Sequence, residues 1–436
     1  SQSGILIYQI IFMKNSGNSN MVAIITMCFI FAMISFVTNM GAPFGNIWGY
    51  TYPWAGMMGN MMNFAAYLFM GIPAGNMLIK YGYKKTALIA LAVGVVGLAI
   101  QYSSSIFGAD ICVFTLESGK VALNLIIYLL GAFVCGFCVC MLNTVVNPML
   151  NILGGGGNRG NQFIQIGGTL NSLTGTLTPL LTGVLIGTVT AKTQMGDVAP
   201  LLFVGMAVFA ISFFIIAKVN IPEPQAEVKE KVSIMSPLKF RHTVLGVIAI
   251  FFYVGVEIGI PAQLNFYISK MSFEGAAAVG GSFAAAYWFL MMCGRFLSSF
   301  ISGKVSTKTQ MTTVSTVAIA LLLIAIFMSE SMTVDFQGNP IPVKCFLIAV
   351  CGLCTSIMWG GIFNLAVEGL GKYTAPASGL FMTMVVGGGI MPLIQDSIAK
   401  SFGEITSYWL VIAMVAYILF YALVGSKNVN KDIKVD

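Results

Sequence analysis

The chain has 436 residues, of which 57% are hydrophobic and only 8% are charged, against roughly 25% charged residues in a soluble domain. A soluble fold cannot hide that much apolar surface, so we expect the chain to sit in a lipid bilayer. The net charge of +7 therefore does not indicate nucleic-acid binding, and we expect no nucleic-acid partner.

The apolar segments are long and continuous, which favours helices over the alternating strands of an outer-membrane barrel. Residues 1–20 are predicted to form a cytoplasmic N-terminal segment, because their apolar run GILIYQIIF is too short to span a bilayer. The following chain divides into twelve predicted spans: 21–43, 55–79, 86–104, 121–150, 162–190, 198–219, 243–268, 276–301, 310–329, 344–369, 376–399 and 405–426.

One long charged stretch separates the spans into two sets of six. Residues 220–242 read NIPEPQAEVKEKVSIMSPLKFRH, and their three prolines argue against one continuous helix. The expected organisation is an all-α membrane protein with two six-helix bundles. Its predicted parts are a first bundle at 21–219, a cytoplasmic loop at 220–242, a second bundle at 243–426 and a cytoplasmic tail at 427–436.

The basic residues orient these spans. With both termini inside, five of the 22 Lys and Arg residues fall outside, and the other 17 fall on the inner side. This asymmetry follows the positive-inside rule and predicts cytoplasmic termini. We expect a multi-pass plasma-membrane protein, in a bacterium an inner-membrane protein. The outer set is Lys120, Lys192, Lys270, Lys344 and Lys400.

Ionisable residues are rare inside the spans. Glu257 lies well within one, whereas Asp396 is nearer an outer end and Arg295 nearer an inner end. An ionisable group within the bilayer is costly, which favours a functional role. Glu257 could carry a coupling proton or cation, accept hydrogen bonds from a substrate, or serve as a structural carboxyl bonded to a neighbouring helix.

Side-chain amides dominate the remaining polar groups of the spans, and aromatic residues accompany them. An amide offers a donor and an acceptor without net charge, and an aromatic face can stack on a sugar ring. The set therefore favours a neutral polyhydroxy ligand, although any single amide could equally join two helices. The predicted substrate-binding residues are Asn39, Asn143, Asn171, Glu257, Gln263, Asn265, Tyr287, Trp359, Asn364 and Gln395.

No pattern typical of an enzyme, a metal site or a cofactor site emerges, and we expect none of these. Glycines 387–389 lie inside the eleventh span, where they allow a bend or a close helix contact. Kinked, glycine-rich helices suit a protein that changes shape across the membrane, and tight packing is the alternative reading.

Several stretches resemble the fucose permease family, the sugar symporters of the major facilitator superfamily. In the second half these are FFYVGVEIG (251–259), YWFLMMCGRF (287–296), SIMWGGIFNLAVEGLG (356–371) and SGLFMTMVVGGGIMPLIQ (378–395). In the first half they are NTVVNPMLNILG (143–154), GTLNSLTG (168–175) and the degenerate loop GNMLIKYGYKK (75–85). The resemblance implies a transporter with alternating access to a central site and a small sugar as substrate. We expect the protein to be a monomer.

The departures from the family concern its proton relay. The resemblance places the family's two acids, in helices one and four, at Asn39 and Asn143, and its aromatic platform at Trp359. Asparagine cannot titrate, so we expect uptake of a hexose or related neutral sugar without the family's relay. A sodium- or proton-coupled symporter using Glu257, a drug or lipid efflux carrier, and a non-transporting sensor or intramembrane enzyme remain alternatives.

Overall fold

The computed structural model describes residues 17–56, 58–187, 189–224 and 232–436. Most of the N-terminal segment predicted over 1–20, and residues 225–231 of the charged loop, lie outside the described residues. The described part contains eleven helical segments that are long and apolar enough to cross a membrane. A further 30-residue helix, α6, occupies the position of the fifth predicted span, and its Gly-, Thr- and Asn-rich sequence makes it less apolar.

The helices follow the predicted order and confirm the all-α fold. The first half contains α2 (Gly17–Thr51), α3 (Met58–Tyr81), α4 (Tyr83–Ser103), α5 (Leu123–Leu153), α6 (Gly157–Ile186) and α7 (Ala199–Lys218). The second half contains α8 (Arg241–Ser269), α9 (Ala276–Ile301), α10 (Thr307–Phe327), α11 (Val343–Thr355), α12 (Met358–Ala366), α13 (Thr374–Thr383), α14 (Gly387–Phe402) and α15 (Glu404–Phe420).

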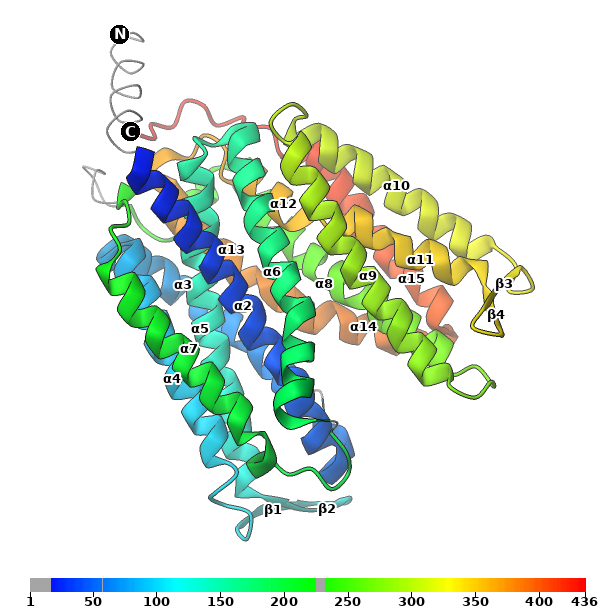
Figure 1. Cartoon of the computed structure of the whole chain (residues 1–436). Helices are drawn as coiled ribbons and strands as arrows, with labels where there is room; N and C mark the ends of the chain where they lie inside the picture. The colour runs from blue at the N-terminus through cyan, green and yellow to red at the C-terminus, as the bar shows by residue number, and fades with distance from the viewer. Residues whose placement is uncertain (1–16, 57, 188, 225–231) are drawn as a thin grey trace.

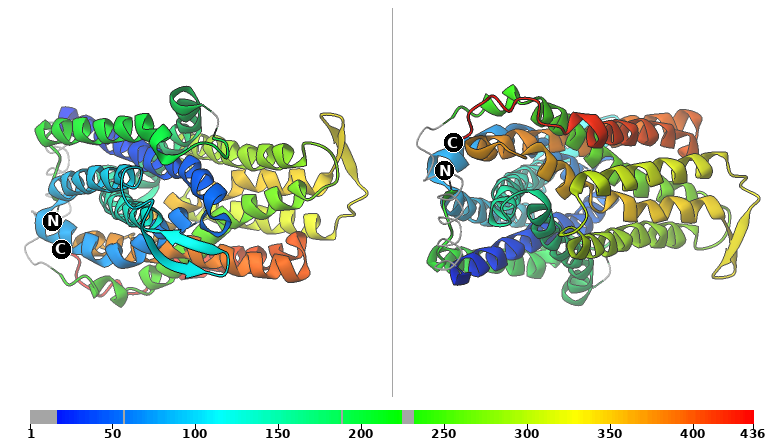
Figure 2. Two further views of the ribbon diagram at one scale, coloured as in Figure 1. Left: turned by 90° about the horizontal axis from the view of Figure 1, so that it is seen from below. Right: turned by 90° about the horizontal axis from the view of Figure 1, so that it is seen from above.

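Helices α2–α7 pack mainly against one another, and so do α8–α12, α14 and α15, which gives two bundles, whereas α13 packs mainly against α3 and α5 of the first. Figure 2 shows the first bundle, coloured blue to green, beside the second, coloured light green to red, with the orange α13 reaching into the first. In Figure 1 the bundles meet at the end where α2 begins and the chain ends, and they spread apart toward the opposite end. The two ends of the described chain thus lie on one side, the cytoplasmic side.

Two short hairpins, which the sequence did not predict, mark the outer side. Strands β1 (Cys112–Leu116) and β2 (Gly119–Ala122) pair antiparallel between α4 and α5. Strands β3 (Thr333–Phe336) and β4 (Asn339–Pro342) pair in the same way between α10 and α11. Equivalent connections in the two bundles therefore carry the same motif (Figure 1).

Two predicted spans are interrupted near the bundle interface. The tenth is divided into α11 and α12 at Ser356–Ile357, and the eleventh into α13 and α14 by a 3-10 turn at Met384–Val386. A broken helix leaves backbone carbonyls without helical partners, which lipid cannot supply. Side chains must bond these carbonyls, and the breaks therefore become positions where side chains of other helices converge.

Glycines allow the helices to approach closely in the cytoplasmic half of the interface. A Cβ on Gly71 of α3 would lie 2.6 Å from the backbone nitrogen of Thr383, at the end of α13. A Cβ on Gly379 would lie 2.7 Å from Gly71 O and 2.7 Å from Gly75 Cα. Because α13 belongs to the second bundle by sequence, these glycines set the distance between the bundles.

The inter-bundle loop is fixed to the first bundle by a carboxylate. Glu223 accepts hydrogen bonds from the backbone N–H groups of Tyr83 (2.7 Å) and Lys84 (3.0 Å) at the start of α4. The first N–H groups of a helix have no helical partners and attract negative charge. Glu223 therefore attaches the start of the inter-bundle loop to α4.

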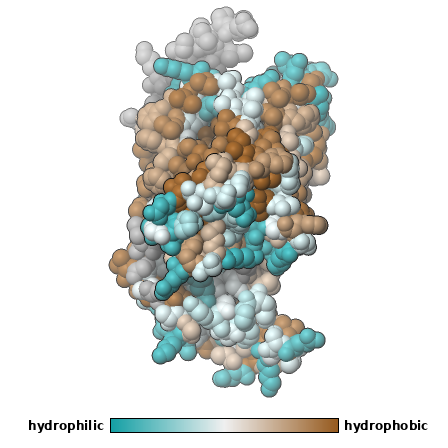
Figure 3. All heavy atoms as spheres, turned by 90° about the vertical axis from the view of Figure 1, so that its right-hand side faces the viewer, coloured by the Kyte–Doolittle hydropathy of each residue, from teal (hydrophilic) through white to brown (hydrophobic). Residues whose placement is uncertain are grey.

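The outer surface of the helices is apolar, as a bilayer requires. Figure 3 shows apolar surface in the upper part of one face, with hydrophilic residues at the upper edge and over the lower part. Large side chains such as Phe214, Phe300 and Phe327 are 65–75% exposed. Such contiguous apolar exposure fits lipid as the neighbour.

Candidate functional site

A hydrogen-bonded string of polar side chains crosses the interface between the bundles. Trp359 of α12 donates its Nε1–H to Asn147 Oδ1 of α5 at 3.0 Å. Asn147 donates to the backbone oxygen of Asn143 at 2.9 Å. Asn143 in turn donates to the hydroxyl of Tyr67 on α3 at 2.8 Å. The string thus joins one helix of the second bundle to two of the first, and it contains two predicted residues, Asn143 and Trp359.

The string lies deep in the protein and carries no formal charge. Asn143 lies ten residues before the end of α5, about 15 Å along the helix from its cytoplasmic end. Asn143 and Asn147 are buried, whereas Trp359 is half-buried and meets Phe381 edge-on at 5.8 Å between ring centroids. An indole with amides close by can take both the apolar face and the hydroxyl groups of a sugar.

A charged pair lies beside this string. Arg295 of α9 is only 9% exposed, and its Nη2 is 3.9 Å from Glu257 Oε1 of α8. Its Nε donates to the backbone oxygen of Ser356 at 2.9 Å, at the break between α11 and α12. Its Nη1 donates to Ser172 Oγ at 2.8 Å and to Gly168 O at 3.3 Å, both on α6 of the first bundle. Arg295 therefore satisfies a carbonyl of the broken helix and bridges the two bundles.

Two buried tyrosines also converge on the break in the tenth span. Tyr253 donates its hydroxyl to the backbone oxygen of Thr355 at 3.2 Å. The Tyr287 hydroxyl lies 2.9 Å from Thr355 Oγ1. The predicted residue Tyr287 is thus fully buried and contacts a residue next to the break, which indicates a supporting role.

The cytoplasmic side of the interface is closed by a row of amides, which we call the cytoplasmic seam. Asn364 of α12 accepts from Asn151 Nδ2 of α5 at 2.7 Å, and it donates to Gly157 O and Thr307 Oγ1 at 3.0 Å each. Three further bonds complete the seam: Asn161 to Ser302 Oγ (3.2 Å), Gln162 to Ser299 O (2.8 Å) and Gln165 to Ile357 O (3.1 Å). The predicted residue Asn364 lies in this seam, five residues after Trp359 on α12 and bonded to Asn151 rather than to the string.

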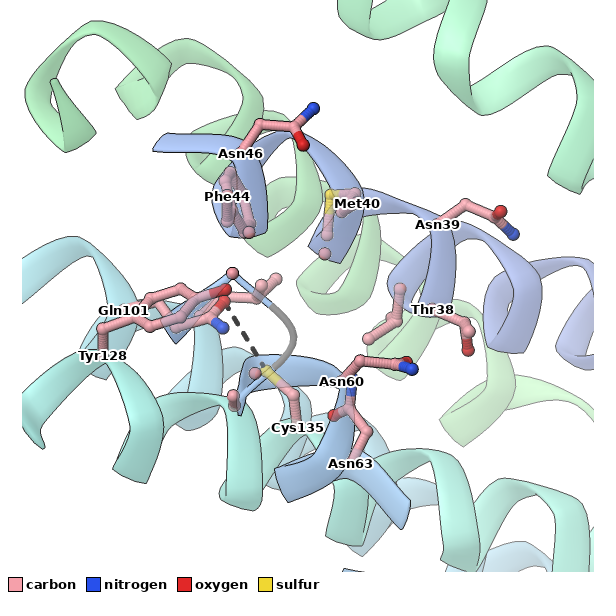
Figure 4. Close-up of a pocket in the computed structure, with 17 residues that line it drawn as sticks. Thr38, Asn39, Met40, Phe44, Asn46, Asn60, Asn63, Gln101, Tyr128 and Cys135 are labelled. Carbon is pink, nitrogen blue, oxygen red and sulfur yellow. Dashed lines mark hydrogen bonds between the residues drawn. The ribbon is translucent and has the colours of Figure 1, made fainter. Parts of the chain in front are cut away.

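A separate polar pocket of about 300 Å³ lies within the first bundle, lined by α2, α3, α4 and α5. Figure 4 shows Gln101, Tyr128 and Cys135 on one side and Asn39 and Asn60 on the other. The lining carries no charged residue. Asn39 lines this pocket and donates to the backbone oxygen of Ser35 at 2.8 Å. The oxygen of Asn63, another lining residue, is buried without a hydrogen-bond partner in the described part of the chain.

The other predicted site residues are dispersed. Asn171 of α6 donates to Phe31 O within the first bundle at 2.9 Å. Gln263, Asn265 and Gln395 lie in the outer half of the second bundle. Their partners there are Asp396 Oδ1 at 3.1 Å for Gln263, Ser269 Oγ at 3.0 Å for Asn265 and Ser407 Oγ at 3.3 Å for Gln395.

The structure also brings in residues that the predicted set omitted. Asn147 follows Asn143 by four residues, so the helical period alone places both amides on one face of α5. Arg295 is a near-buried charge within a predicted span. Like Glu257, it could have been selected as an ionisable residue inside the bilayer. Tyr67 gave no such signal, because a tyrosine among apolar residues of α3 reads as ordinary packing.

Comparisons with known proteins agree with this architecture. Residues 22–392 match the model of the Major Facilitator Superfamily. A glucose/galactose transporter of Brucella abortus biovar 1 (strain 9-941) is 30% identical over 373 residues, covering 84% of each chain. The L-fucose-proton symporter of Escherichia coli (strain K12) is 22% identical over 389 residues, covering 81% of each chain. The resemblance to the fucose permease family is thereby confirmed.

Solved structures share the fold. A crystal structure of the transporter FucP in the outward conformation aligns with a TM-score of 0.78 at 19% identity, covering 94% of this chain and all of that one. The proton:xylose symporter XylE bound to 6-bromo-6-deoxy-D-glucose aligns with a TM-score of 0.71 at 9% identity, covering 94% and 97%. At these identities the likeness is one of fold.

Proposed function

Because the chain belongs to the major facilitator superfamily, we propose that it takes up a hexose or related neutral sugar by alternating access. The observation that carries this proposal is the tryptophan–amide string between the bundles, near the membrane centre. Neutral donors and acceptors beside a half-buried indole suit a neutral sugar. The relatives named glucose/galactose transporters support the same class of substrate.

The proposed substrate site is built around Trp359 and the Asn143–Asn147 pair. Superfamily transporters bind substrate near the midplane between their bundles. Trp359 belongs to the second bundle and the two asparagines to the first, so a sugar at this position contacts both halves. We propose that the charge-free pocket lined by Asn39 and Asn60 receives the sugar on its way from the outer side.

The proposed transport does not use the family's proton relay. Asn39 and Asn143 stand where the resemblance places the two acids, and each amide already makes a hydrogen bond, to Ser35 and Tyr67 respectively. Neither can gain or lose a proton. Glu257 lies within ion-pair distance of Arg295, which favours a fixed counter-charge over a proton carrier. Amide and carboxylate oxygens also suit sodium, which remains the alternative driver.

The test is uptake of radiolabelled hexoses into proteoliposomes. We expect saturable uptake, reduced in Trp359→Ala and unchanged in Trp409→Ala, whose indole is 44% exposed on α15. Absence of saturable uptake of any hexose by well-folded protein would refute a sugar carrier and favour a drug or lipid carrier.

The same vesicles determine the driving force when a pH gradient, a sodium gradient or neither is imposed. We expect no uphill accumulation with the pH gradient. Accumulation with sodium alone would identify a sodium symporter, and equilibration under all conditions a uniporter. Accumulation driven by the pH gradient and lost in Glu257→Gln would overturn the proposed role of Glu257.

A further inference from the structure

Arg295 uses its hydrogen bonds on two sides of the bundle interface. Nε is bonded to Ser356 O, within its own bundle, while Nη1 is bonded to Gly168 O and Ser172 Oγ of the other bundle. A guanidinium has five N–H donors in a fixed planar fork and stays charged, so it can hold several such acceptors at once. Arg295 is therefore part of what holds the cytoplasmic side closed.

Opening of the cytoplasmic side must break half of this arrangement. When α6 moves away from α9, Nη1 loses both of its acceptors on α6. A buried charge that loses its hydrogen-bond partners is strongly destabilised. In the cytoplasm-open conformation a carboxylate stabilises the freed guanidinium more than water does. A partner in the second bundle can stay beside Arg295, because that bundle moves as one body with it.

Glu257 meets these requirements. It lies on α8, which packs directly against α9. Its Oε1 is 3.9 Å from Nη2, within ion-pair distance but beyond hydrogen-bond distance. The side chains of Glu257 and Arg295 are only 19% and 11% exposed, so water screens the pair weakly. Asp396, another carboxylate within a span of this bundle, is 3.1 Å from Lys400 and accepts from Gln263 toward the outer end.

We propose that Arg295 exchanges Gly168 and Ser172 for Glu257 each time the cytoplasmic side opens. In the closed conformation the guanidinium bridges the bundles, and Glu257 is a counter-charge beyond hydrogen-bond distance. In the open conformation the carboxylate takes the freed N–H groups. Glu257 thus stabilises the cytoplasm-open conformation through Arg295, and both act as positioning residues for the conformational change. This inference rests on the proposed alternating access.

A cysteine reporter measures the exchange without sugar. Ile164 of α6 is 2% exposed, and its Cγ2 would lie 2.8 Å from a Cβ on Gly360 of α12, across the closed interface. Ile164→Cys, in a Cys112→Ser background that removes an exposed thiol, is labelled in inside-out vesicles with a membrane-impermeant maleimide. Its labelling rate reports how often the cytoplasmic side opens, whether or not the protein carries sugar.

Two variants should change this rate in opposite directions. Glu257→Gln should lower labelling about tenfold, because an amide binds the freed guanidinium less strongly than a carboxylate. Ser172→Ala should raise labelling about tenfold, because it removes an acceptor present only in the closed conformation. Glu404→Gln, the same chemical change in an ion pair with Lys270 at the outer surface, is the matched control.

The two opposite changes, with the control unaltered, support the exchange. Glu257→Gln with unchanged or faster labelling would overturn it, as would Ser172→Ala with unchanged or slower labelling. Thermal unfolding of each variant separates a lost contact from a lost fold. Hexose uptake by the parent protein is scored separately, so a failed sugar assay refutes the substrate and leaves the labelling result standing.

Discussion

The cytoplasmic and outer halves of the bundle interface differ in how they are joined. On the cytoplasmic side, Asn151 and Asn364 are directly bonded, and Ser378 of α13 donates to Thr144 O at 2.8 Å. Gly71 and Gly379 bring α3 and α13 almost into backbone contact. Toward the outer side the two bundles spread apart, and each ends in its own hairpin (Figure 1).

This difference identifies the conformation and where its stability comes from. The described chain is closed toward the cytoplasm by the Asn151–Asn364 and Ser378–Thr144 bonds, as expected for an outward-facing state. The closure is made of neutral amides, serines and glycines, with Arg295 as the charged member. Neutral hydrogen bonds contribute about 1 kcal/mol each, so such an interface can be closed tightly and still reopen.

The largest effect should come from filling the glycine contact. Gly71→Ala places a methyl group 2.6 Å from the backbone nitrogen of Thr383, and overpacking of this kind costs up to about 3 kcal/mol. The cytoplasm-closed conformation should become roughly a hundredfold less populated, and sugar uptake should fall accordingly.

Uptake assays and Ile164→Cys labelling check this prediction. Gly281→Ala is the matched control, because a Cβ there meets nothing within 4 Å. Normal uptake by Gly71→Ala, at equal protein levels, would mean that α3 and α13 need not approach so closely.

The next effect should come from the cytoplasmic seam. Asn364→Ala leaves Asn151, Gly157 and Thr307 without their partner, at roughly 2 kcal/mol in the closed conformation. In the open conformation water replaces these bonds, so labelling of Ile164→Cys should rise about 30-fold. Asn339→Ala, in an outer hairpin, is the control. Loss of sugar affinity with unchanged labelling would instead return Asn364 to the substrate site.

Asn364 also illustrates how far the sequence predicts the structure. The long apolar runs predict the helices well: the span expected at 276–301 coincides with α9, and that at 243–268 nearly coincides with α8 (Arg241–Ser269). An amide in such a run gives the same signal whether it binds sugar, joins two helices or closes a gate. Its partner, Asn151, lies 213 residues away, and only the packing of the two bundles brings them together.

The break between α11 and α12 was equally hidden from the sequence. No proline occurs between Cys351 and Ala366, and the nearest glycines, Gly352 and Gly360, lie outside the break itself, so the strongest signal of an interrupted helix is absent. The break depends on Arg295, Gln165 and Tyr253 taking up the carbonyls of three consecutive residues. These contacts join residues far apart in the sequence. By contrast, the glycines at 387–389 are a local sequence signal for the irregular eleventh span.

A smaller effect is expected at the indole. Trp359→Ala removes the proposed stacking surface and should weaken sugar binding by at least about 1 kcal/mol, or roughly fivefold. Trp359→Phe keeps an aromatic face but cannot donate to Asn147, so its sugar affinity should lie between those of the parent protein and Trp359→Ala. Isothermal titration with the transported hexose measures both, and Trp409→Ala is the control. Equal affinities in all three variants would move the site away from the string.

The smallest effect is expected at Asn143, which Asn147 separates from Trp359 along the hydrogen bonds of the string. Asn143→Ala loses the hydrogen bond to Tyr67 and the one that Asn143 Oδ1 accepts from Asn147. It should weaken sugar binding by about 0.5–1.5 kcal/mol. Asn124→Ala is the control on the same helix, because the Asn124 oxygen has no hydrogen-bond partner in the described residues.

Asn143 also separates binding from coupling. If this position serves only to bind sugar, Asn143→Ala lowers affinity while the response of uptake to imposed ion gradients stays the same. The measurement is therefore the concentration dependence of uptake under a sodium gradient and without one. A variant that keeps its affinity but loses accumulation would show that the amide contributes to an ion site, because amide oxygens can ligate sodium. That result would replace the uniform string with two adjacent sites, one for the sugar at Trp359 and one for the ion at Asn143.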